Sequence, residues 1–533
     1  MSAEPTAAVS VPPTPAIDIL AEAEDLLAGL LREPWGQVSP SVYETGRLVA
    51  LSPWLTGHDQ RIDHLLLNQR PDGGWGSPEP GYALVPTLSA TDALLSARRA
   101  GAENAATAGL RVLFRWLRGP GALTAADLPD LPAIELIVPS LIMSINRRLD
   151  DTEDAGERWP GAERLRTPAG IDDAPLRLIQ GRLSAGHPLP LKLAHALEVA
   201  VPGAHRHPLF RPETNGSVGA SPASTAAWLG RPDDMAGSPA VAFLREAVRQ
   251  HAGPVPCGLP VTVFERGWVL GWLLRAGIPI DPPAELVAGL SASLGPGGTP
   301  AAAGLPEDAD TTSVALYALA LAGAPRPPDP LWAYESGDHF STWPGEDGVS
   351  ITTNAHVLEA FGQYQRVARG PDDIRHTNTI AKVAAWLRHQ QREDGSWHDR
   401  WHASPYYATY CAALALDAFD GPRSAEAVRR AVRWALVTQR VDGSWGRWAG
   451  TAEETAYALQ LLLATGRGRA AGRDGKVRQA ATRGYEYLIR SPRDAEGPAL
   501  WHDKDLYRPT AIVRAGVLAA LHLGHRDGLT PRA

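Results

Sequence analysis

Two carboxyl groups stand one residue apart in the middle of the chain, at Asp308 and Asp310. The apolar residues that follow, 314–322, predict a buried helix ending at Gly323, so both groups lie at or just before a helix N-terminus. Aspartate there commonly caps the helix by accepting backbone N–H bonds. Two carboxyl groups in an apolar setting also repel as anions, so one tends to keep its proton. A neutral carboxylic acid can protonate a carbon–carbon double bond, so helix cap and general acid are both open interpretations.

The composition of the chain excludes several classes of protein. At 533 residues the chain exceeds one ordinary core, and two or three domains are expected. A net charge of −8 gives no reason to expect nucleic acid, and no apolar run reaches the roughly 18 residues that span a bilayer. Two cysteines, Cys257 and Cys411, suit a reducing compartment. Residues 1–15 lack the features of a signal peptide and are expected to form a disordered tail, so we expect a soluble, cytoplasmic protein.

A short repeat explains part of an unusual composition, seventeen tryptophans against seven phenylalanines. The pattern Gln-x-x-Asp-Gly-x-Trp occurs at residues 69–75, 391–397 and 439–445, with degenerate copies at residues 213–218 and 491–501. Each clear copy follows one helical stretch and precedes another. Asp-Gly predicts a tight turn. The glutamine can form hydrogen bonds with backbone groups at a helix end, and the tryptophan offers a flat face for packing. The repeat therefore predicts an all-α fold of stacked helical hairpins that close into α-α barrels.

The positions of the repeats and of the Pro/Gly-rich breaks indicate two barrels. One clear copy lies near the N-terminus and two lie in the last third of the chain, with the paired aspartates between them. Breaks occur at residues 119–130, 155–174, 201–212 and 277–284. We therefore expect two helical barrels with a boundary near residues 279–283.

The repeats together with Asp308-x-Asp310 resemble the class II terpene cyclases, and further segments resemble the bacterial diterpene cyclases related to copalyl diphosphate synthases. These segments follow one order over about residues 30–525. They are residues 68–76, 134–141, 192–198, 215–226, 353–360 and 394–407. The resemblance implies protonation of the terminal double bond of geranylgeranyl diphosphate, ring closure through carbocations, and loss of a proton with the diphosphate retained. The expected product is ent-copalyl diphosphate.

The resemblance also implies how the two barrels are connected, in the βγ architecture of this family. After the tail of residues 1–15, an N-terminal helix within residues 16–48 is expected to pack with the C-terminal β barrel, residues 281–533. The γ barrel, residues 49–280, is inserted between them. The substrate cavity is expected between the barrels.

The resemblance assigns catalytic roles to three residues. Asp310 matches the proton donor of the family's Asp-x-Asp-Asp, and Asp308 would keep it protonated and aimed, while Thr311 replaces the last aspartate. His195 matches a histidine that in the plant enzymes pairs with an asparagine to position the water for the final deprotonation. That asparagine aligns with Cys257, and a thiol is a poor partner for water. The terminating base is therefore open, and a rearranged halimane or clerodane diphosphate is an alternative product.

A carbocation cascade needs a dry cavity lined by aromatic rings, because water captures cations and ring faces stabilise positive charge. Ordinary core packing is the alternative for each aromatic side chain, and the tryptophans of the repeats are assigned to structure. The candidates for substrate binding are Trp228, Phe264, Trp268, Tyr317, Phe340 and Trp343.

Diphosphate binding in this family implies Mg²⁺, a hard cation that takes oxygen ligands. Asp127 and Asp130 lie where the family carries an acidic motif and are the candidate metal ligands, with a solvated loop as the alternative. Arg182, together with Arg177, lies where the family places a basic residue on the phosphates.

The sequence also offers alternatives to this function. Residues 150–154 spell the Asp-Asp-x-x-Asp motif of class I terpene synthases, but they open a charged, turn-rich stretch without a second metal motif, so a solvated loop is expected. The rivals are a hopene-type triterpene cyclase, a non-catalytic α-α barrel binding protein, and a prenyltransferase-like subunit, whose zinc site the two cysteines do not support. The expected partner is geranylgeranyl diphosphate, with no nucleic acid and no stable membrane insertion. The sequence leaves the oligomeric state open.

Overall fold

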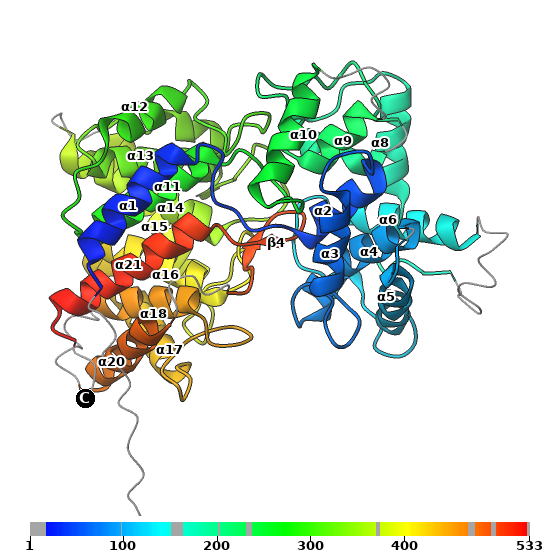
Figure 1. Ribbon diagram of the computed structural model, residues 1–533. Helices are drawn as coiled ribbons and strands as arrows, with labels where there is room; N and C mark the ends of the chain where they lie inside the picture. Colours follow the sequence, from blue (N-terminus) through cyan, green and yellow to red (C-terminus); the bar gives the residue numbers. More distant parts are fainter. Residues whose placement is uncertain are drawn as a thin grey trace, which may run out of the picture.

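The computed structural model describes residues 17–97, 99–150, 164–200, 203–230, 237–368, 374–466, 475–491 and 497–529. Within these residues the fold is helical apart from short strands, and Figure 1 shows the helices gathered into two bodies. The structure thus confirms the predicted all-α fold. The strands form two hairpins, β1 (Glu335–Ser336) with β2 (His339–Phe340) and β3 (Trp501–His502) with β4 (Leu506–Tyr507).

The larger barrel is a closed double ring of helices. Its inner ring contains α11 (Thr262–Ala276), α13 (Ala309–Leu321), α14 (Ile351–Val367), α16 (Pro405–Phe419), α18 (Ala452–Ala464) and α21 (Thr510–Arg526). Each inner helix contacts the next, and α21 contacts α11, so the ring is closed. The outer helices each lie against a neighbouring pair of inner ones. They are α1 (Ile19–Arg32), α12 (Ala284–Ser293), α15 (Ile374–His389), α17 (Ala425–Val437) and α20 (Gly475–Arg490).

The two rings differ in sequence because they differ in burial. The inner helix α13 is buried continuously over residues 311–320, since other helices surround it. The outer helix α17 buries one stripe, which includes Val428, Ala431 and Val432, and exposes the charged residues between. A helix that is apolar all round belongs in a core, and an amphipathic one covers it.

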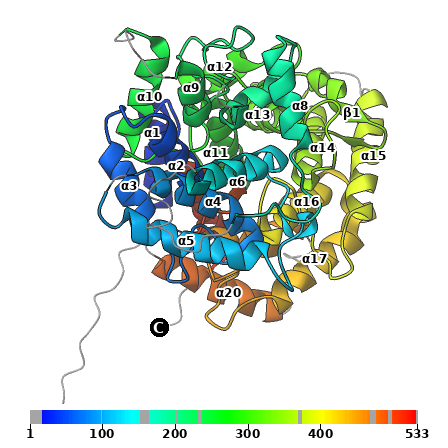
Figure 2. The ribbon, with the colours of Figure 1, turned by 90° about the vertical axis from the view of Figure 1, so that its right-hand side faces the viewer.

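The smaller barrel follows the same plan. Its inner ring is formed by α2 (Val42–Leu51), α4 (Pro80–Ser96), α6 (Ile134–Asp150), the 3₁₀ segment η2 (Leu191–Ala200) and α9 (Pro222–Leu229), and α9 contacts α2 to close the ring. Figure 2 shows α2, α4 and α6 at the centre of this face with other helices around them. The outer helices are α3 (His58–Leu67), α5 (Ala102–Leu117), α8 (Ala174–Ser184) and α10 (Pro239–Gln250). Further 3₁₀ turns are η1 (Ala125–Asp127), η3 (Asp329–Tyr334) and η4 (Gly421–Ser424).

The repeated motif closes the helical hairpins through backbone bonds, as the sequence predicted. In one copy the side-chain amide of Gln391 donates to the carbonyl groups of Gly395 and Ala427, at 2.9 and 2.8 Å. The indole of Trp397 donates to a carbonyl near the end of α15, and the ring is fully buried. The other two copies make the same bonds. Gly395 has φ of +97°, and a Cβ there would lie 2.6 Å from a backbone oxygen of α17, so glycine is required.

The limits of the barrels differ from the expected boundaries at 48/49 and 280/281. Helix α2 belongs to the inner ring of the smaller barrel, and α11 packs within the larger one beside α13 and α21. The proline-rich break at residues 279–283 therefore follows the first inner helix of the larger barrel and does not separate the barrels. The chain crosses between them before α2 and again before α11, where the Ser41 N–H donates to the Val255 carbonyl at 2.9 Å. Helix α1 lies against α21 and α11.

The hairpin β3–β4 reaches from the larger barrel to the smaller one (Figure 1). At its tip the Lys504 ammonium is fully buried, 2.8 Å from the Glu44 carboxylate and 2.9 Å from that of Glu198. It also donates to the Ser221 hydroxyl at 2.9 Å. All three partners belong to the smaller barrel, so this cation ties the two barrels together. None of the described helices combines the length and apolar character needed to cross a bilayer.

Candidate active site

A cavity of about 780 Å³ lies between the two barrels. The smaller barrel contributes residues before α6 and in η2, and the larger one contributes the start of α13, the loop after β2 and the hairpin β3–β4. This volume lies within the roughly 300–1,000 Å³ typical of small-molecule sites. Aromatic rings form much of the wall, namely Phe264, Trp343, Trp401, Tyr407, Trp501 and Tyr507.

Asp308 lines this cavity and is the N-cap of α13. Its Oδ1 accepts the backbone N–H of Thr311 at 2.6 Å, and only 4% of the residue is exposed. Burial, with a smaller contribution from the nearby Asp310 charge, raises the pKa of Asp308 to about 7. Asp308 therefore caps the helix and is also a carboxyl group that keeps its proton up to about pH 7.

Asp310 lies in the first turn of α13, lines the cavity, and is bonded to a histidine. Its Oδ1 accepts the Nδ1–H of His356, a residue of α14, at 2.7 Å. Burial opposes a charge on His356, but the Asp310 carboxylate and the hydrogen bond to it raise the pKa of His356 well above its usual value. Opposite an ionised Asp310, His356 is therefore an imidazolium, which contacts the Trp268 ring and makes a hydrogen bond with Cys411.

This arrangement can act as a strong general acid. Because Oδ1 of Asp310 is bonded to His356, Oδ2 is the oxygen left to carry the proton that is given to the substrate. The imidazolium stabilises the carboxylate that remains after the proton has left, through a charge-assisted hydrogen bond in a water-poor setting. Such stabilisation makes transfer to a weak base more favourable.

A second histidine–aspartate pair lines the cavity at the junction of the barrels. His195 Nε2 lies 2.8 Å from Asp503 Oδ1, and Nδ1 lies 2.7 Å from the carbonyl oxygen of Gly219. A carbonyl only accepts, so Nδ1 donates, and the carboxylate accepts from Nε2. Burial opposes the charge, but the Asp503 carboxylate outweighs it and raises the pKa of His195. His195 is thus a cation without a free lone pair, which argues against its taking the final proton and against the water-positioning role that the resemblance implied.

Two of the predicted aromatic residues, Phe264 and Trp343, line the cavity. Trp268 lies one layer behind the wall, because α11 turns it towards α14 and its indole donates to the Tyr407 hydroxyl at 2.9 Å. Only 1% of Trp268 is exposed, so it supports the wall without forming it.

The other predicted aromatic residues lie in the cores of the barrels. Phe340 is fully buried against Phe361 in the larger barrel, and Tyr317 is buried within the same core. Trp228 packs in the smaller barrel among the cores on either side of α9. These three residues pack in the barrel cores, which was the alternative to substrate binding. Inner helices and their connections carry large side chains because these fill the centre of the ring.

The exposed edge of the cavity carries charged side chains from both barrels. Arg400 lies 2.9 Å from a carboxylate oxygen of Asp130 and 3.2 Å from one of Glu346. Asp130 therefore reaches the cavity, as the predicted role of metal ligand would require. The charged residues of this edge are Asp130, Glu135, Lys192, Glu346, Asp347 and Arg400.

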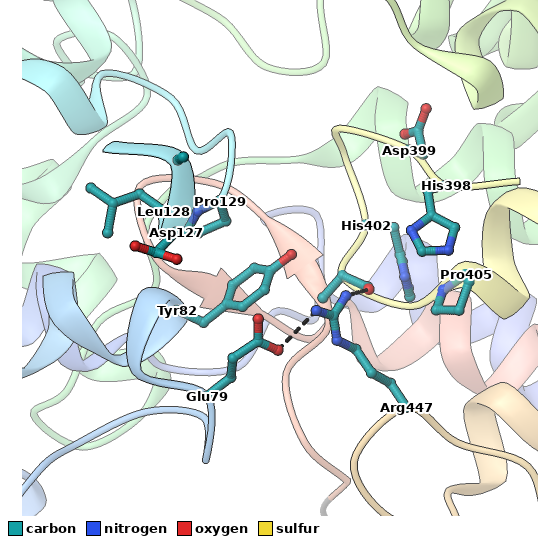
Figure 3. Close-up of a pocket in the computed structure, with 12 residues that line it drawn as sticks. Glu79, Tyr82, Asp127, Leu128, Pro129, His398, Asp399, His402, Pro405 and Arg447 are labelled. Carbon is teal, nitrogen blue, oxygen red and sulfur yellow. Dashed lines mark hydrogen bonds and ion pairs between the residues drawn. The ribbon is translucent and has the colours of Figure 1, made fainter. Parts of the chain in front are cut away.

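Asp127 does not join Asp130 in that cavity, which corrects the predicted pair of metal ligands. Its carboxylate accepts the N–H and hydroxyl of Thr124, at 2.8 and 2.7 Å, because it closes the η1 turn. It faces a smaller pocket of about 260 Å³, shown in Figure 3. Glu79 there pairs with Arg447 at 2.8 Å. Among the described residues, no three His, Cys, Asp or Glu side chains gather as a metal site.

Two further predicted sites lie away from the cavity or outside the described residues. Arg182 is exposed on α8 and does not line the cavity, because its helix is an outer one. Of the Asp-Asp-x-x-Asp motif, Asp150 ends α6 and bonds Arg164, and residues 151–154 lie outside the described residues.

Comparisons with known proteins agree with this geometry. Residues 346–512 match the family model of the squalene-hopene cyclase C-terminal domain. The chain is 42% identical over 508 residues to the ent-copalyl diphosphate synthase of a Streptomyces species, covering 94% of this chain and 95% of the relative. The chain belongs to the bacterial class II diterpene cyclases. It is also 40% identical over 529 residues to labda-7,13-dienyl diphosphate synthase of Streptomyces clavuligerus, covering 96% and 94%.

A solved structure supports the same assignment. The ent-copalyl diphosphate synthase from Streptomyces platensis matches this class II cyclase with a TM-score of 0.89 and 43% identity, over 96% of this chain and 100% of that chain. The protein is therefore an enzyme of the intramolecular lyase or isomerase type, and the non-catalytic barrel is not supported. Full-length similarity to diphosphate synthases also disfavours the hopene-type alternative.

Two residues of this diterpene cyclase site were missed by sequence reasoning. His356 stands in the segment 353–360, whose close resemblance to the family could have signalled a role. Asp503 lies 308 positions from His195 and outside every segment that carried the resemblance, so only the folded contact reveals it.

Proposed function

We propose that this enzyme converts geranylgeranyl diphosphate to copalyl diphosphate, with the ent series expected. The observation that carries the proposal is the acid group, Asp310 bonded to the His356 imidazolium, at the wall of an aromatic cavity. Asp310 gives its proton to the terminal double bond, and two ring closures carry the positive charge along the chain. A proton is then lost and the diphosphate is retained. The names of full-length relatives at 40–42% identity support this substrate and product class.

The cavity wall supports a cationic sequence. The Tyr407 and Trp501 rings lie 4.7 Å apart, and Trp343 meets Trp401 edge to face at 5.3 Å, so the rings are held rigidly. Aromatic faces stabilise positive charge by about 0.5–2 kcal/mol each and do not react with it as water would.

Mg²⁺ forms part of the same proposal. The exposed edge of the cavity carries four carboxylates among its described residues, against Lys192 and Arg400, so it would repel a diphosphate. A hard divalent cation with one or two carboxylate ligands and phosphate oxygens removes that repulsion. Asp130 and Glu135 fit as those ligands, whereas Asp127 does not. When bound, Mg²⁺ neutralises phosphate charge.

Chelation tests this role. Because the diphosphate is not cleaved, removing Mg²⁺ with EDTA should raise the KM for geranylgeranyl diphosphate much more than it lowers kcat. Steady-state rates over a range of free Mg²⁺ measure the two effects separately. A fall in kcat alone, or inorganic pyrophosphate as a main product, would contradict the proposal.

The product test is direct. Purified protein is incubated with geranylgeranyl diphosphate and Mg²⁺, the product is dephosphorylated, and the alcohol is identified by mass spectrometry and chiral comparison with ent and normal copalol. Failure to consume the substrate would refute the proposed function. The matched control is Asp310→Asn, which should leave the substrate unchanged.

A rearranged halimane or clerodane diphosphate is the second candidate product. Cys257 favours it, since this residue is buried at the junction near Asp503 and takes the place of the family's asparagine. Relatives at about 40% identity already carry names of different products, copalyl and labda-7,13-dienyl diphosphate. The chiral product test separates the candidates, because methyl shifts give a different carbon skeleton.

A further inference from the structure

The Asp503 carboxylate has one oxygen engaged and one available. Oδ1 accepts from His195 Nε2 at 2.8 Å and from the backbone N–H of Lys504 at 2.6 Å. No hydrogen bond to Oδ2 is found among the described residues. The side chain lines the cavity and keeps 19% of its surface accessible, although it lies where the two barrels meet. An ionised oxygen without a partner thus adjoins the space in which the substrate would lie.

Beside this oxygen the cavity wall has a gap large enough for a methyl group. Gly258 also lines the cavity, and a Cβ placed on it would lie 3.5 Å from Oδ2 of Asp503 and 3.8 Å from Cε1 of His195. These are ordinary contact distances, so the missing side chain leaves room for a C–H group directly against the carboxylate. The imidazolium beside it cannot serve the same purpose, because both of its nitrogens already donate.

We propose that Asp503 accepts the proton that ends the cyclisation cascade, and that His195 is the positioning residue that holds it. The proposal rests on the proposed function, since it supplies the last step of that reaction. The bicyclic cation loses a proton from a carbon next to the cationic centre, and the C–H bonding pair becomes the new double bond. The proton passes to Oδ2 and is released to water with the product. One proton enters from Asp310 and one leaves through Asp503, so the reaction is an isomerisation.

The surroundings suit a carboxylate that must stay ionised until the last step. The facing charged groups are the His195 imidazolium and, from the same hairpin, the Lys504 ammonium, which Glu44 and Glu198 also contact. The His195 and Lys504 charges, against the cost of burial, hold the pKa of Asp503 below its usual value. A fixed anion also attracts the migrating positive charge to this part of the cavity, which favours deprotonation here over capture by water.

The test compares two substitutions that separate acceptor from positioning residue. Asp503→Asn keeps the size of the side chain and an oxygen for Nε2, but an amide does not accept the proton. It should consume substrate at a rate within about tenfold of the wild type, because protonation at Asp310 commits the substrate. Its product should change from one olefin to a mixture rich in alcohol, which carries oxygen-18 when the reaction is run in ¹⁸O-labelled water.

His195→Gln keeps an N–H donor for Asp503 and should retain the single olefin as main product, whereas His195→Ala should give a mixture. Asp505→Asn is the matched control, because Asp505 lies two residues along the same hairpin and its oxygens bond Ser41, Tyr43 and Leu506 outside the cavity. Circular dichroism and melting temperature establish folding for each variant.

The outcomes decide the assignment. An unchanged single olefin at an unchanged rate from Asp503→Asn would overturn it, as would a folded Asp503→Asn variant that consumes no substrate, since Asp503 would then act before ring closure. If that variant does not fold, Gly258→Ala answers the same question by filling the space against Oδ2. It should raise the alcohol fraction, and an unchanged product would again overturn the proposal. A wild-type enzyme that consumes no geranylgeranyl diphosphate would instead refute the proposed function.

Discussion

The two histidine–aspartate pairs of the cavity have the same components and different tasks. In each pair a buried histidine donates to one carboxylate oxygen, and the aspartate lines the cavity. Asp310 must hold a proton to act, and its neighbour Asp308 is a second carboxyl group whose pKa is raised to about 7. Asp503 has instead the Lys504 ammonium beside it, which favours the carboxylate. The proton donor thus has a second carboxyl group beside it, whereas the proton acceptor has an ammonium group beside it.

Asp310→Asn tests the donor. An amide has no proton of sufficient acidity, so consumption of geranylgeranyl diphosphate should fall by at least about 10²-fold, the lower end of what a general acid contributes. The His356 N–H can still donate to the amide oxygen, so the melting temperature should stay within a few degrees. Near-wild-type turnover with an unchanged melting temperature would remove Asp310 from this role.

The pH dependence of turnover tests Asp308. As the pH rises through about 7, Asp308 loses its proton, and this anion opposes formation of a second carboxylate at Asp310 when the substrate is protonated. We therefore expect kcat to fall above pH 7. The free energy of unfolding should respond in the same direction, because folded Asp308 binds its proton more tightly than the unfolded chain, and this contribution is lost between about pH 4 and 7.

Asp308→Asn is the matched variant for that profile. Asparagine caps a helix as well as aspartate does, so α13 should stay intact. Turnover should be low but measurable, and the decline near pH 7 should disappear. A decline of unchanged position in this variant would assign it to another group.

At the scale of elements, the repeated turns determine where the helical hairpins close. A substitution of Gln391 tests this role. Gln391→Ala removes two hydrogen bonds and leaves two carbonyl groups without that donor. The free energy of unfolding should fall by about 1–3 kcal/mol, and kcat should be unchanged at temperatures well below melting. Urea denaturation measures the loss. The control is Glu393→Ala in the same turn, whose exposed side chain should change stability by less than about 0.5 kcal/mol. Equal effects of the two would contradict the structural role of the repeat.

The sequence predicts those features that depend on residues close together in the chain. The helical class, the barrels and the capping position of Asp308 depend on turns and apolar runs that are continuous in the chain. The boundaries near residues 48 and 280 were misplaced, because Pro and Gly mark the ends of α11 as strongly as they mark a domain limit. Trp228 and Phe340 were misassigned because a ring's direction depends on which face its element turns to the cavity. His356 and Asp503 reach their partners only through contacts between distant segments.

At the scale of the whole molecule, the cavity exists only while the two barrels keep their relative position. Lys504 from the larger barrel lies among Glu44, Glu198 and Ser221 of the smaller one, and Asp503 directly precedes it. A contact that joins the barrels therefore lies directly beside the proposed proton acceptor in the chain. A change in the relative position of the barrels should therefore alter both the stability of the protein and the identity of the product.

Lys504→Met tests the connection. It removes the buried cation and leaves two buried carboxylates facing each other, which should cost about 3–5 kcal/mol of unfolding free energy. Adding Glu44→Gln and Glu198→Gln should recover part of that loss, because the unpaired charges are then gone. The control is Lys382→Met, which breaks a partly exposed pair with Glu335 and should cost about 0–1 kcal/mol. Denaturation followed by tryptophan fluorescence should show one transition in the wild type and two in Lys504→Met, because loss of this buried contact weakens the coupling between the barrels. A single transition with unchanged stability would show that Lys504 does not hold the barrels together.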